Sequence, residues 1–211
     1  MSRELKVSLK YNLTGNSTAC FGEFVSDLDA AGFDRRNTLV VLEAVKTVDY
    51  NPARPEYFKS ASEAAADAYI SCTEAALKAD WKISLSHVFQ PPCMYTQEKP
   101  STILICPDGR VSRYISVYTG DPDFYGGDVL GEGLPASGYG VREEILGNAG
   151  QCMKAQCPYF PICMTGCPSF KKMAMKSVRT AFCRRPYFER VVSGLSALRA
   201  ALAHDYRKLD L

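Results

Sequence analysis

Apolar and polar residues alternate at the start of the chain, which is the pattern of a half-buried β-strand. The alternation covers residues 6–13 and ends at the turn-forming residues 14–16. Residues 18–31 then place apolar side chains three and four positions apart, with Gly32 just beyond them as a C-terminal cap. The first part of the chain is therefore predicted to form a strand, a turn and a helix.

A second strand and a second helix are predicted to follow. Residues 38–48 are rich in β-branched and apolar side chains, as in a mostly buried strand. The pattern Ser60-x-x-Glu63 is typical of a helix N-terminus, and the Ala-rich run behind it predicts a helix that continues to about Lys78. The order strand, helix, strand, helix predicts parallel strand pairing through right-handed crossovers.

Later patterns predict a strand, a hairpin and a long C-terminal helix. Residues 81–90 are strand-like, and residues 101–106 and 110–118 flank a turn at 107–109 in which Asp and Gly supply the tight geometry. Residues 186–208 place apolar side chains on one face of a helix that begins with a proline. We expect this helix to pack back on the first half of the chain.

The composition suits one large domain or two small ones. The chain has 211 residues, of which 46% are hydrophobic, and a net charge of +2. No apolar run approaches the ~20 residues of a membrane span, and the N-terminal sequence lacks the apolar core of a signal peptide. We therefore expect a cytoplasmic protein with no membrane partner, and nothing in the charge indicates a nucleic-acid partner. In that reducing compartment, nine cysteines indicate metal binding rather than disulfides.

Five of the nine cysteines fall within the 32 residues 152–183. Their order is Cys152-x4-Cys157-x5-Cys163-x3-Cys167, followed by fifteen residues and Cys183. Zinc sites usually pair their ligands in short knuckles joined by a longer arm, and this run lacks that symmetry. Four close thiolates with remote ones suit a 4Fe-4S cluster better, although a structural zinc site and buried thiols remain alternatives.

Gly166, directly before the fourth of these cysteines, fits a tightly wound metal site. Because it has no Cβ, the backbone can approach closely there, and we expect backbone N–H groups to point at cluster sulfur.

The cysteine pattern resembles the C-terminal SPASM domain of radical SAM enzymes, whose pattern is C-x9-15-G-x4-C, a gap, C-x2-C-x5-C-x3-C, a second gap, and C. Upstream, Cys93 is followed by fifteen residues, Gly109, four residues and then Tyr114, which stands where the family has its second cysteine. In the later half the first spacing is x4, so Cys152 takes the role of a cysteine expected at Lys154. The resemblance covers about residues 88 to 190.

The resemblance implies the ligands of up to two auxiliary 4Fe-4S clusters. The second auxiliary cluster would be held by Cys152, Cys157, Cys163 and Cys183. The first would be held by Cys93 and Cys167, with Cys106 as a candidate third thiolate that could equally be a packed core residue. With Tyr114 in a ligand position, we expect one cluster, and a second only if another ligand completes the first site.

The first half resembles the last two β/α units of the partial barrel in the same enzymes. The chain has no C-x3-C-x2-C triplet, which in the family binds the cluster that reduces S-adenosylmethionine. The expected fold is therefore α/β: β/α units of a partial TIM-type barrel at residues 1–84, then a small α+β cysteine-rich domain at 85–211 with a β-hairpin and a C-terminal helix. We expect the chain to be the C-terminal part of such an enzyme.

The resemblance implies an electron-transfer and substrate-docking module of a radical SAM enzyme that modifies peptides or proteins. Its expected partners are an N-terminal radical SAM half or a peptide or protein substrate, and S-adenosylmethionine would bind only if the missing part is supplied. Whether this chain is itself an enzyme stays open, and it is not expected to initiate radical chemistry. Two alternatives are a zinc-stapled interaction module and a remnant without function.

The remaining candidate residues are expected to be structural. His87 and His204 are the only histidines, and neither has the neighbours of an acid–base or nucleophilic site, so no catalytic residue is assigned. Cys20 and Cys72 fall in predicted helices and are expected in the core. Residues 171–190 contain seven basic residues and one acidic residue, and these cations could stabilise the reduced form of a cluster bound at Cys183.

Overall fold

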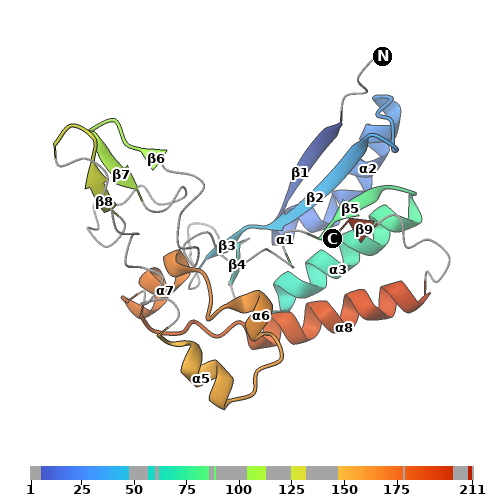
Figure 1. The fold of residues 1–211 in the computed structure, drawn as a ribbon. Helices are drawn as coiled ribbons and strands as arrows, with labels where there is room; N and C mark the ends of the chain where they lie inside the picture. Colours follow the sequence, from blue (N-terminus) through green and yellow to red (C-terminus); the bar gives the residue numbers. More distant parts are fainter. Residues whose placement is uncertain are drawn as a thin grey trace. The chain divides into compact units, whose positions relative to one another are not determined.

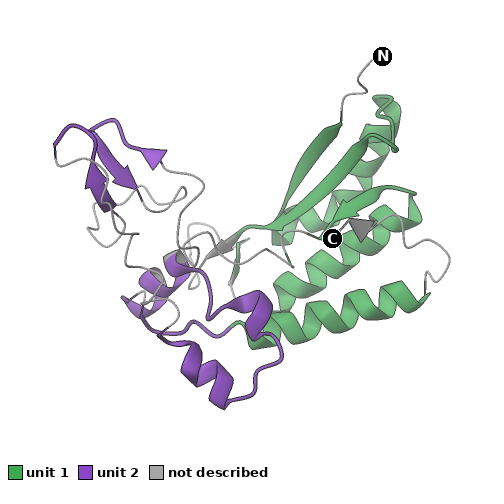
Figure 2. Cartoon of the chain, in the orientation of Figure 1, with its two compact units in different colours: residues 1–91, 184–211 green, residues 92–183 purple. Residues whose placement is uncertain are grey.

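The computed structural model describes residues 6–47, 57–59, 62–85, 88, 104–112, 125–131, 147–177, 179–201 and 209–210. The chain divides into two compact units, one formed by residues 1–91 and 184–211 and the other by residues 92–183 (Figure 2). The first unit thus includes the C-terminal helix, which the sequence boundary at 84/85 assigned to the second domain. The two units are described separately below.

The first unit contains a four-stranded sheet in which every neighbouring pair of strands is parallel (Figure 1). Its order is β1 (Val7–Leu13), β2 (Thr38–Ala44), β5 (Lys82–Ser84) and β9 (Leu209–Asp210). The parallel pairing expected from the sequence is confirmed, with Val7 opposite Thr38 and Leu13 opposite Ala44. The expected strand at 38–48 is split, because β3 (Lys46–Thr47) pairs with β4 (Phe58–Lys59) in a separate two-stranded sheet.

The first helical segment is divided into α1 (Gly15–Ala19) and α2 (Phe21–Ala30), so the predicted turn at 14–16 and single helix are wrong. Thr14 caps α1 through a reciprocal pair of hydrogen bonds with Ser17, of 3.0 and 2.7 Å, which starts a helix earlier than the apolar pattern predicts. Cys20 (φ −91°, ψ 4°) interrupts the helix.

The helix α3 (Glu63–Lys78) begins later than its sequence pattern predicts. Ser62 caps it by accepting a hydrogen bond of 3.3 Å from the Ala65 N–H, so Glu63 is the first residue and not the third. The expected cap, Ser60, lies outside the described residues. On the inner face of α3, the buried Tyr69 hydroxyl donates to the Ser84 carbonyl at 3.1 Å and joins the helix to β5.

The core of the first unit lies between the sheet and its helices. Alternate residues of β2 are buried, and Tyr11 of β1 contacts the rings of Phe21 and Phe24 in α2 with centroids 5.1 and 4.6 Å apart. The residues of β1 that alternate with these, including Ser8 and Lys10, are exposed, and Lys10 forms an ion pair with Glu43 of β2. One face of the β1–β2 pair is therefore apolar, whereas the other is mixed, with polar residues of β1 opposite Leu39 and Val41 of β2.

The long helix α8 (Arg185–Ala201) packs on α3, as expected from its apolar face. Its buried side chains are Tyr187, Phe188, Val191 and Leu195. At Gly194 the two helices approach so closely that an added Cβ would lie 2.7 Å from Cγ1 of Ile70. Arg190 also donates to Asp67 of α3 at 2.5 Å. These contacts explain why residues 184–211 belong to the first unit.

In the part of the second unit that the structure describes, there are a small antiparallel sheet and three short helices. The sheet consists of β6 (Leu104–Ile105), β7 (Arg110–Ser112) and β8 (Tyr125–Asp128). The predicted hairpin is confirmed, and Gly109 (φ +85°) supplies the left-handed residue of its turn. The helices are α5 (Ala149–Lys154), α6 (Phe160–Cys163) and α7 (Pro168–Met175).

The described strands form three separate sheets, and none of these sheets closes into a barrel. Helices and strands occur in both units, and the partial barrel stays a prediction. Among the described helices, none combines the length and the apolar character needed to span a membrane.

We expect Gly194→Val to lower the free energy of unfolding by about 1–3 kcal/mol, because the new side chain has to displace Ile70 from the α3–α8 contact. Gly22→Val is the matched control, since a Cβ at this exposed helical glycine meets nothing within 4 Å. The control should change stability by no more than about 0.5 kcal/mol. Urea unfolding followed by the fluorescence of the buried Trp81 measures both values, and equal effects would refute the close packing.

Candidate metal centre

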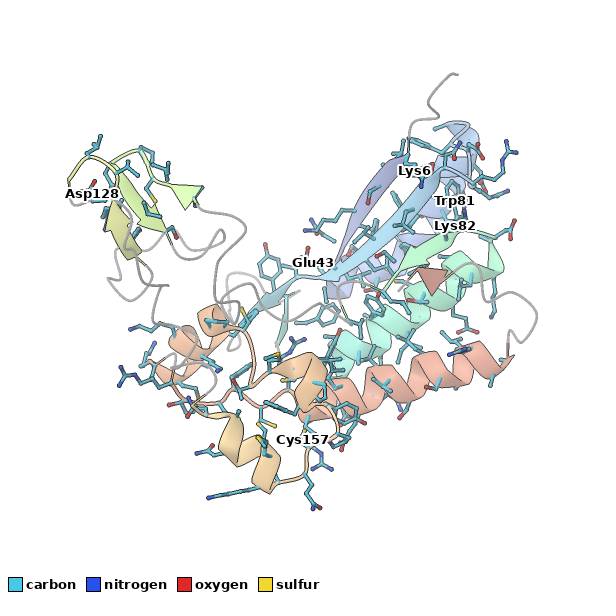
Figure 3. The ribbon with its side chains drawn as sticks, viewed as in Figure 1. Lys6, Glu43, Trp81, Lys82, Asp128 and Cys157 are labelled. Atoms are coloured by element: carbon cyan, nitrogen blue, oxygen red, sulfur yellow. The ribbon has the colours of Figure 1, made fainter. Side chains whose placement is uncertain are left out.

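The cysteine-rich segment places its five cysteines on short helices and the turns between them. Cys152 lies in α5, Cys157 follows it, Cys163 is the last residue of α6, Cys167 caps α7, and Cys183 is the last residue of the second unit. Four of these thiols are half-buried and Cys183 is exposed. Other sulfur atoms lie around Cys157, beside α5 and α6 (Figure 3).

The C-terminus of α5 returns the chain so that Cys157 lies against the helix that carries Cys152. Gln156 has a left-handed backbone (φ +46°), and its N–H donates to the Met153 carbonyl at 3.0 Å. The Cys157 N–H donates to the Cys152 carbonyl at 3.1 Å. This pair of bonds is the Schellman motif, which usually has glycine where Gln156 stands. The x4 spacing is therefore a structured turn that holds the two cysteines together.

The loop between Cys163 and Cys167 is strained. Met164, Thr165 and Gly166 have consecutive positive φ values of 44°, 69° and 96°. A β-branched residue such as threonine rarely adopts this backbone, and each such non-glycine residue costs of order 1–3 kcal/mol. Such a conformation persists only when surrounding contacts hold it in place.

The strand-like segment before Cys183 supplies two of those contacts. The Phe182 N–H donates to the Thr165 carbonyl at 3.0 Å, and an added Cβ on Gly166 would lie 2.7 Å from the Phe182 carbonyl oxygen. The Gly166 N–H itself donates to the Cys163 carbonyl at 2.8 Å, and the expectation that backbone N–H groups point at cluster sulfur stays a prediction. Glycine is needed here because Cys183 reaches the site along a backbone that lies directly against the loop.

Lys171 supplies a further contact and brings a charge into the site. Its side chain is fully buried, and its ammonium donates a short hydrogen bond to the Thr165 hydroxyl. Lysine is rarely buried this completely unless its charge is compensated. The sequence showed Lys171 only as one of the basic residues in 171–190. Its one available signal is its place one helical turn after Cys167, to whose carbonyl its N–H donates at 2.9 Å.

The electrostatics of Cys152 show which groups share its surroundings. Partial burial raises the pKa of its thiol, and the charges of Cys157 and Cys183 raise it further, whereas the Lys171 ammonium acts in the opposite direction. Cys157 and Cys183, two of the other cysteines predicted for the second auxiliary cluster, therefore lie within electrostatic range of Cys152. Because the Cys152 pKa is raised, its thiol is protonated at neutral pH, and a metal must displace that proton.

The other predicted ligands are only partly placed. The strained loop lies between Cys163, the fourth cysteine of the same set, and Cys167, a predicted ligand of the first cluster. Cys106 lies on the hairpin, where its N–H donates to the Arg110 carbonyl at 2.8 Å. Cys93 and Tyr114, together with His87 and His204, lie outside the described residues. Within the part of the chain that the structure describes, no three or more His, Cys, Asp or Glu side chains form a group that could hold a metal ion.

The donor chemistry of the segment nevertheless fits a thiolate-ligated cluster. Its thiols are partly accessible, and a buried cation lies in the same segment, on the helix that follows Cys167. The cysteines of the first unit differ from these. Cys72 is buried as expected, and burial raises its pKa to about 12, whereas Cys20 is exposed and not in the core.

Comparisons of the chain with protein-family models, with curated proteins and with solved structures found no match. The radical SAM resemblance therefore depends on the cysteine spacing and the βα order alone.

We expect Gly166→Ala to disrupt the loop, because its backbone conformation costs about 1–2 kcal/mol for an L-residue and its Cβ collides with the Phe182 carbonyl. The hydrogen bond from the Phe182 N–H should open more often, so that amide hydrogen exchange at Phe182 becomes about tenfold faster or more. Gly150→Ala, at a helical glycine of the same unit with free space around it, should leave that exchange rate unchanged. Equal exchange rates in the two variants would contradict the close approach at Gly166.

Proposed function

We propose that residues 147–183 bind one 4Fe-4S cluster through Cys152, Cys157, Cys163 and Cys183. The observation that carries this proposal is that Cys157, Cys183 and the buried Lys171 all lie close enough to Cys152 to act on the pKa of its thiol. A thiolate-bound cluster carries net negative charge, which a buried ammonium would compensate. The strained loop supports the same proposal, because strain of this kind is concentrated at functional sites.

The distribution of core residues also supports a metal in this unit. Among the described residues of the second unit, the buried apolar side chains are Val111 and Pro168. The other buried aliphatic and aromatic side chains of the described residues belong to the first unit. A small unit that buries little apolar surface usually needs a disulfide or a metal for stability. The described cysteines are free thiols, and metal binding is one of the other means by which such a unit is stabilised.

Iron is favoured over zinc by the cysteine spacing. The two short pairs, Cys152–Cys157 and Cys163–Cys167, are separated by only five residues, whereas zinc knuckles are usually joined by a longer arm. A cubane takes its four thiolates from corners of a larger body and accepts interleaved positions more readily. When bound, such a cluster supplies one-electron transfer. The chain's own residues hold it, exclude water from its inner side and compensate its charge.

On the basis of the SPASM resemblance, we propose that the chain is an electron-transfer and substrate-docking module of a peptide- or protein-modifying radical SAM enzyme. It would work in the cytoplasm, where its cysteines stay reduced. Its partners would be a radical SAM half or the peptide or protein substrate itself. A second cluster would require Cys93, Cys106 and Cys167 to come together with another ligand.

We expect Cys157→Ser and Cys163→Ser each to abolish cluster binding and to destabilise residues 150–185, because cluster binding at this site contributes directly to folding. Iron, sulfide and zinc analysis after anaerobic reconstitution, together with absorbance near 400 nm, measures the loss. Cys20→Ser, at the exposed cysteine of the first unit, is the matched control and should keep full iron content.

Two results would count against this ligand assignment. If both serine variants keep the iron content and thermal stability of the unmodified chain, the named cysteines are not the ligands. If the unmodified chain contains one zinc and no iron, the zinc-stapled interaction module replaces the cluster protein.

We also expect this chain alone not to cleave S-adenosylmethionine. Reductive cleavage needs a cluster with one open iron, which the family supplies from the C-x3-C-x2-C triplet that is absent from these 211 residues. A cluster with four thiolate ligands has no open iron. Incubation of the reconstituted chain with S-adenosylmethionine and dithionite should yield no 5'-deoxyadenosine above a cluster-free control, and its formation without a second protein would refute the proposed non-initiating role.

A further inference from the structure

We propose that the outer edge of β1 joins two copies of this chain, through antiparallel pairing of β1 with β1 of the second copy about a twofold axis at Leu9. The surface is the backbone of residues 7–11 on the side of β1 that faces away from β2, which we call the β1 edge. This inference concerns the first unit and does not depend on the cysteine site.

The backbone of β1 has one side bonded to β2 and one open side (Figure 1). The Val7 N–H donates to the Asn37 carbonyl at 2.8 Å, just before the first residue of β2. Because alternate residues of a strand direct their N–H and C=O groups to opposite edges, the odd-numbered residues of β1 bond to β2. Ser8 and Lys10 therefore direct their backbone groups outward, where none of the described strands pairs with β1.

Ser17 limits the open part of this edge. Its hydroxyl donates to the Asn12 carbonyl at 2.8 Å, so this outward-facing carbonyl already has a partner. Since β1 begins at Val7, the β1 edge spans five residues whose middle is Leu9. A twofold axis makes the same segment contact itself in both copies, and the whole segment is used only when the axis passes through its middle.

The β1 edge lacks the usual protection of an exposed strand. Natural proteins protect such edges with short strands, prolines, bulges or charged side chains. Among the described strands, β9 forms the opposite edge of the sheet and has only two residues, whereas β1 has seven, without proline, and pairs with β2 without a bulge. Its one charged side chain, Lys10, forms an ion pair with Glu43 of β2, which compensates its charge.

The charges along β1 favour the same register. An axis at Ser8 places Lys10 opposite Lys6 of the second copy, and an axis at Lys10 places two Lys10 side chains opposite each other. An axis at Leu9 instead places Ser8 opposite Lys10. Like charges directly opposite each other destabilise a strand pair, so the register centred on Leu9 is preferred to its two neighbours.

This register also pairs apolar side chains on the opposite face of β1. Leu9 lies opposite Leu9 of the second copy, and Val7 lies opposite Tyr11. All three side chains are only half-buried in the single chain, so pairing removes further apolar surface from water. One strand pair is a small interface beside the roughly 1,200–2,000 Å² of a stable complex, so we expect a dimer that dissociates on dilution.

The test changes the charge at the exposed Ser8 and measures the dimer dissociation constant of the full-length chain by sedimentation equilibrium under reducing conditions. Ser8→Glu places a carboxylate opposite Lys10 of the second copy, twice in each dimer, and should lower the constant about threefold or more. Ser8→Lys should raise it by a similar factor, and the neutral control Ser8→Ala should match the unmodified chain. Added salt should reduce both charge effects.

A backbone variant tests the edge itself. Ser8→Pro removes an N–H that faces away from β2 and none that bonds to it, so the strand should persist by circular dichroism while dimerisation is lost. If Ser8→Pro does not fold, the charge variants decide.

Three results would overturn the proposal. A chain that stays monomeric at every concentration has no self-pairing edge, including the case in which β1 accepts a strand of a different protein. A dimer that Ser8→Glu and Ser8→Lys leave unchanged, or that folded Ser8→Pro retains, forms elsewhere on the molecule. Equal weakening by Ser8→Glu and Ser8→Lys excludes the axis at Leu9. None of these measurements requires bound iron, so they stand or fall separately from the proposed cluster.

Discussion

The left-handed run at residues 164–166 is the constraint on which the cysteine site depends. It turns the chain back between Cys163 and Cys167, and it is unfavourable for two of its three residues. The conformation is held from two directions, by the Phe182 backbone on one side and by the Lys171 ammonium on the other. The backbone next to Cys183 and the Lys171 ammonium are thereby both held against this loop. Residues that are distant in the sequence thus keep a fixed geometry around it.

The two units obtain their stability in different ways. The first unit has a conventional core, in which α3 packs against the parallel sheet on one side and α8 on the other. The second unit depends on turns, capped helix ends and a buried polar pair, Lys171 with Thr165. Polar networks of this kind stabilise a fold only when their charges are compensated.

The sequence predicted the elements whose periodicity is long enough to be unambiguous. The strands β1 and β2, the helices α3 and α8 and the turn at Gly109 all lie close to where the pattern placed them. Errors occurred where a local side-chain contact decided the outcome, as when Thr14 and Ser17 started a helix in a predicted turn. The helices α5 and α6 are only six and four residues long, which is too short to produce a helical pattern.

The sequence supplied candidate ligands for the site, which stay predictions, but it did not indicate the burial of a charged residue there. Cysteine spacing is visible in a sequence, whereas the burial of Lys171 depends on tertiary contacts, and a lysine in a basic run is ordinarily a surface residue. The same applies to the φ values of Met164 and Thr165, since neither residue type indicates a left-handed backbone. Only Gly166 gave a sequence signal for the tight turn, and the carbonyl that requires it belongs to Phe182, sixteen positions away.

Burial determines which thiols of this protein are available for metal chemistry. Cys72 is enclosed by the core of the first unit, where burial alone acts on it and raises its pKa to about 12, so it stays protonated and inert. Cys152 is only partly buried, and the Lys171 ammonium opposes the rise in its pKa. A metal ion therefore has to overcome a smaller barrier to deprotonate Cys152 than Cys72. The contrast follows mainly from the difference in burial, to which the Lys171 ammonium adds a smaller effect at Cys152.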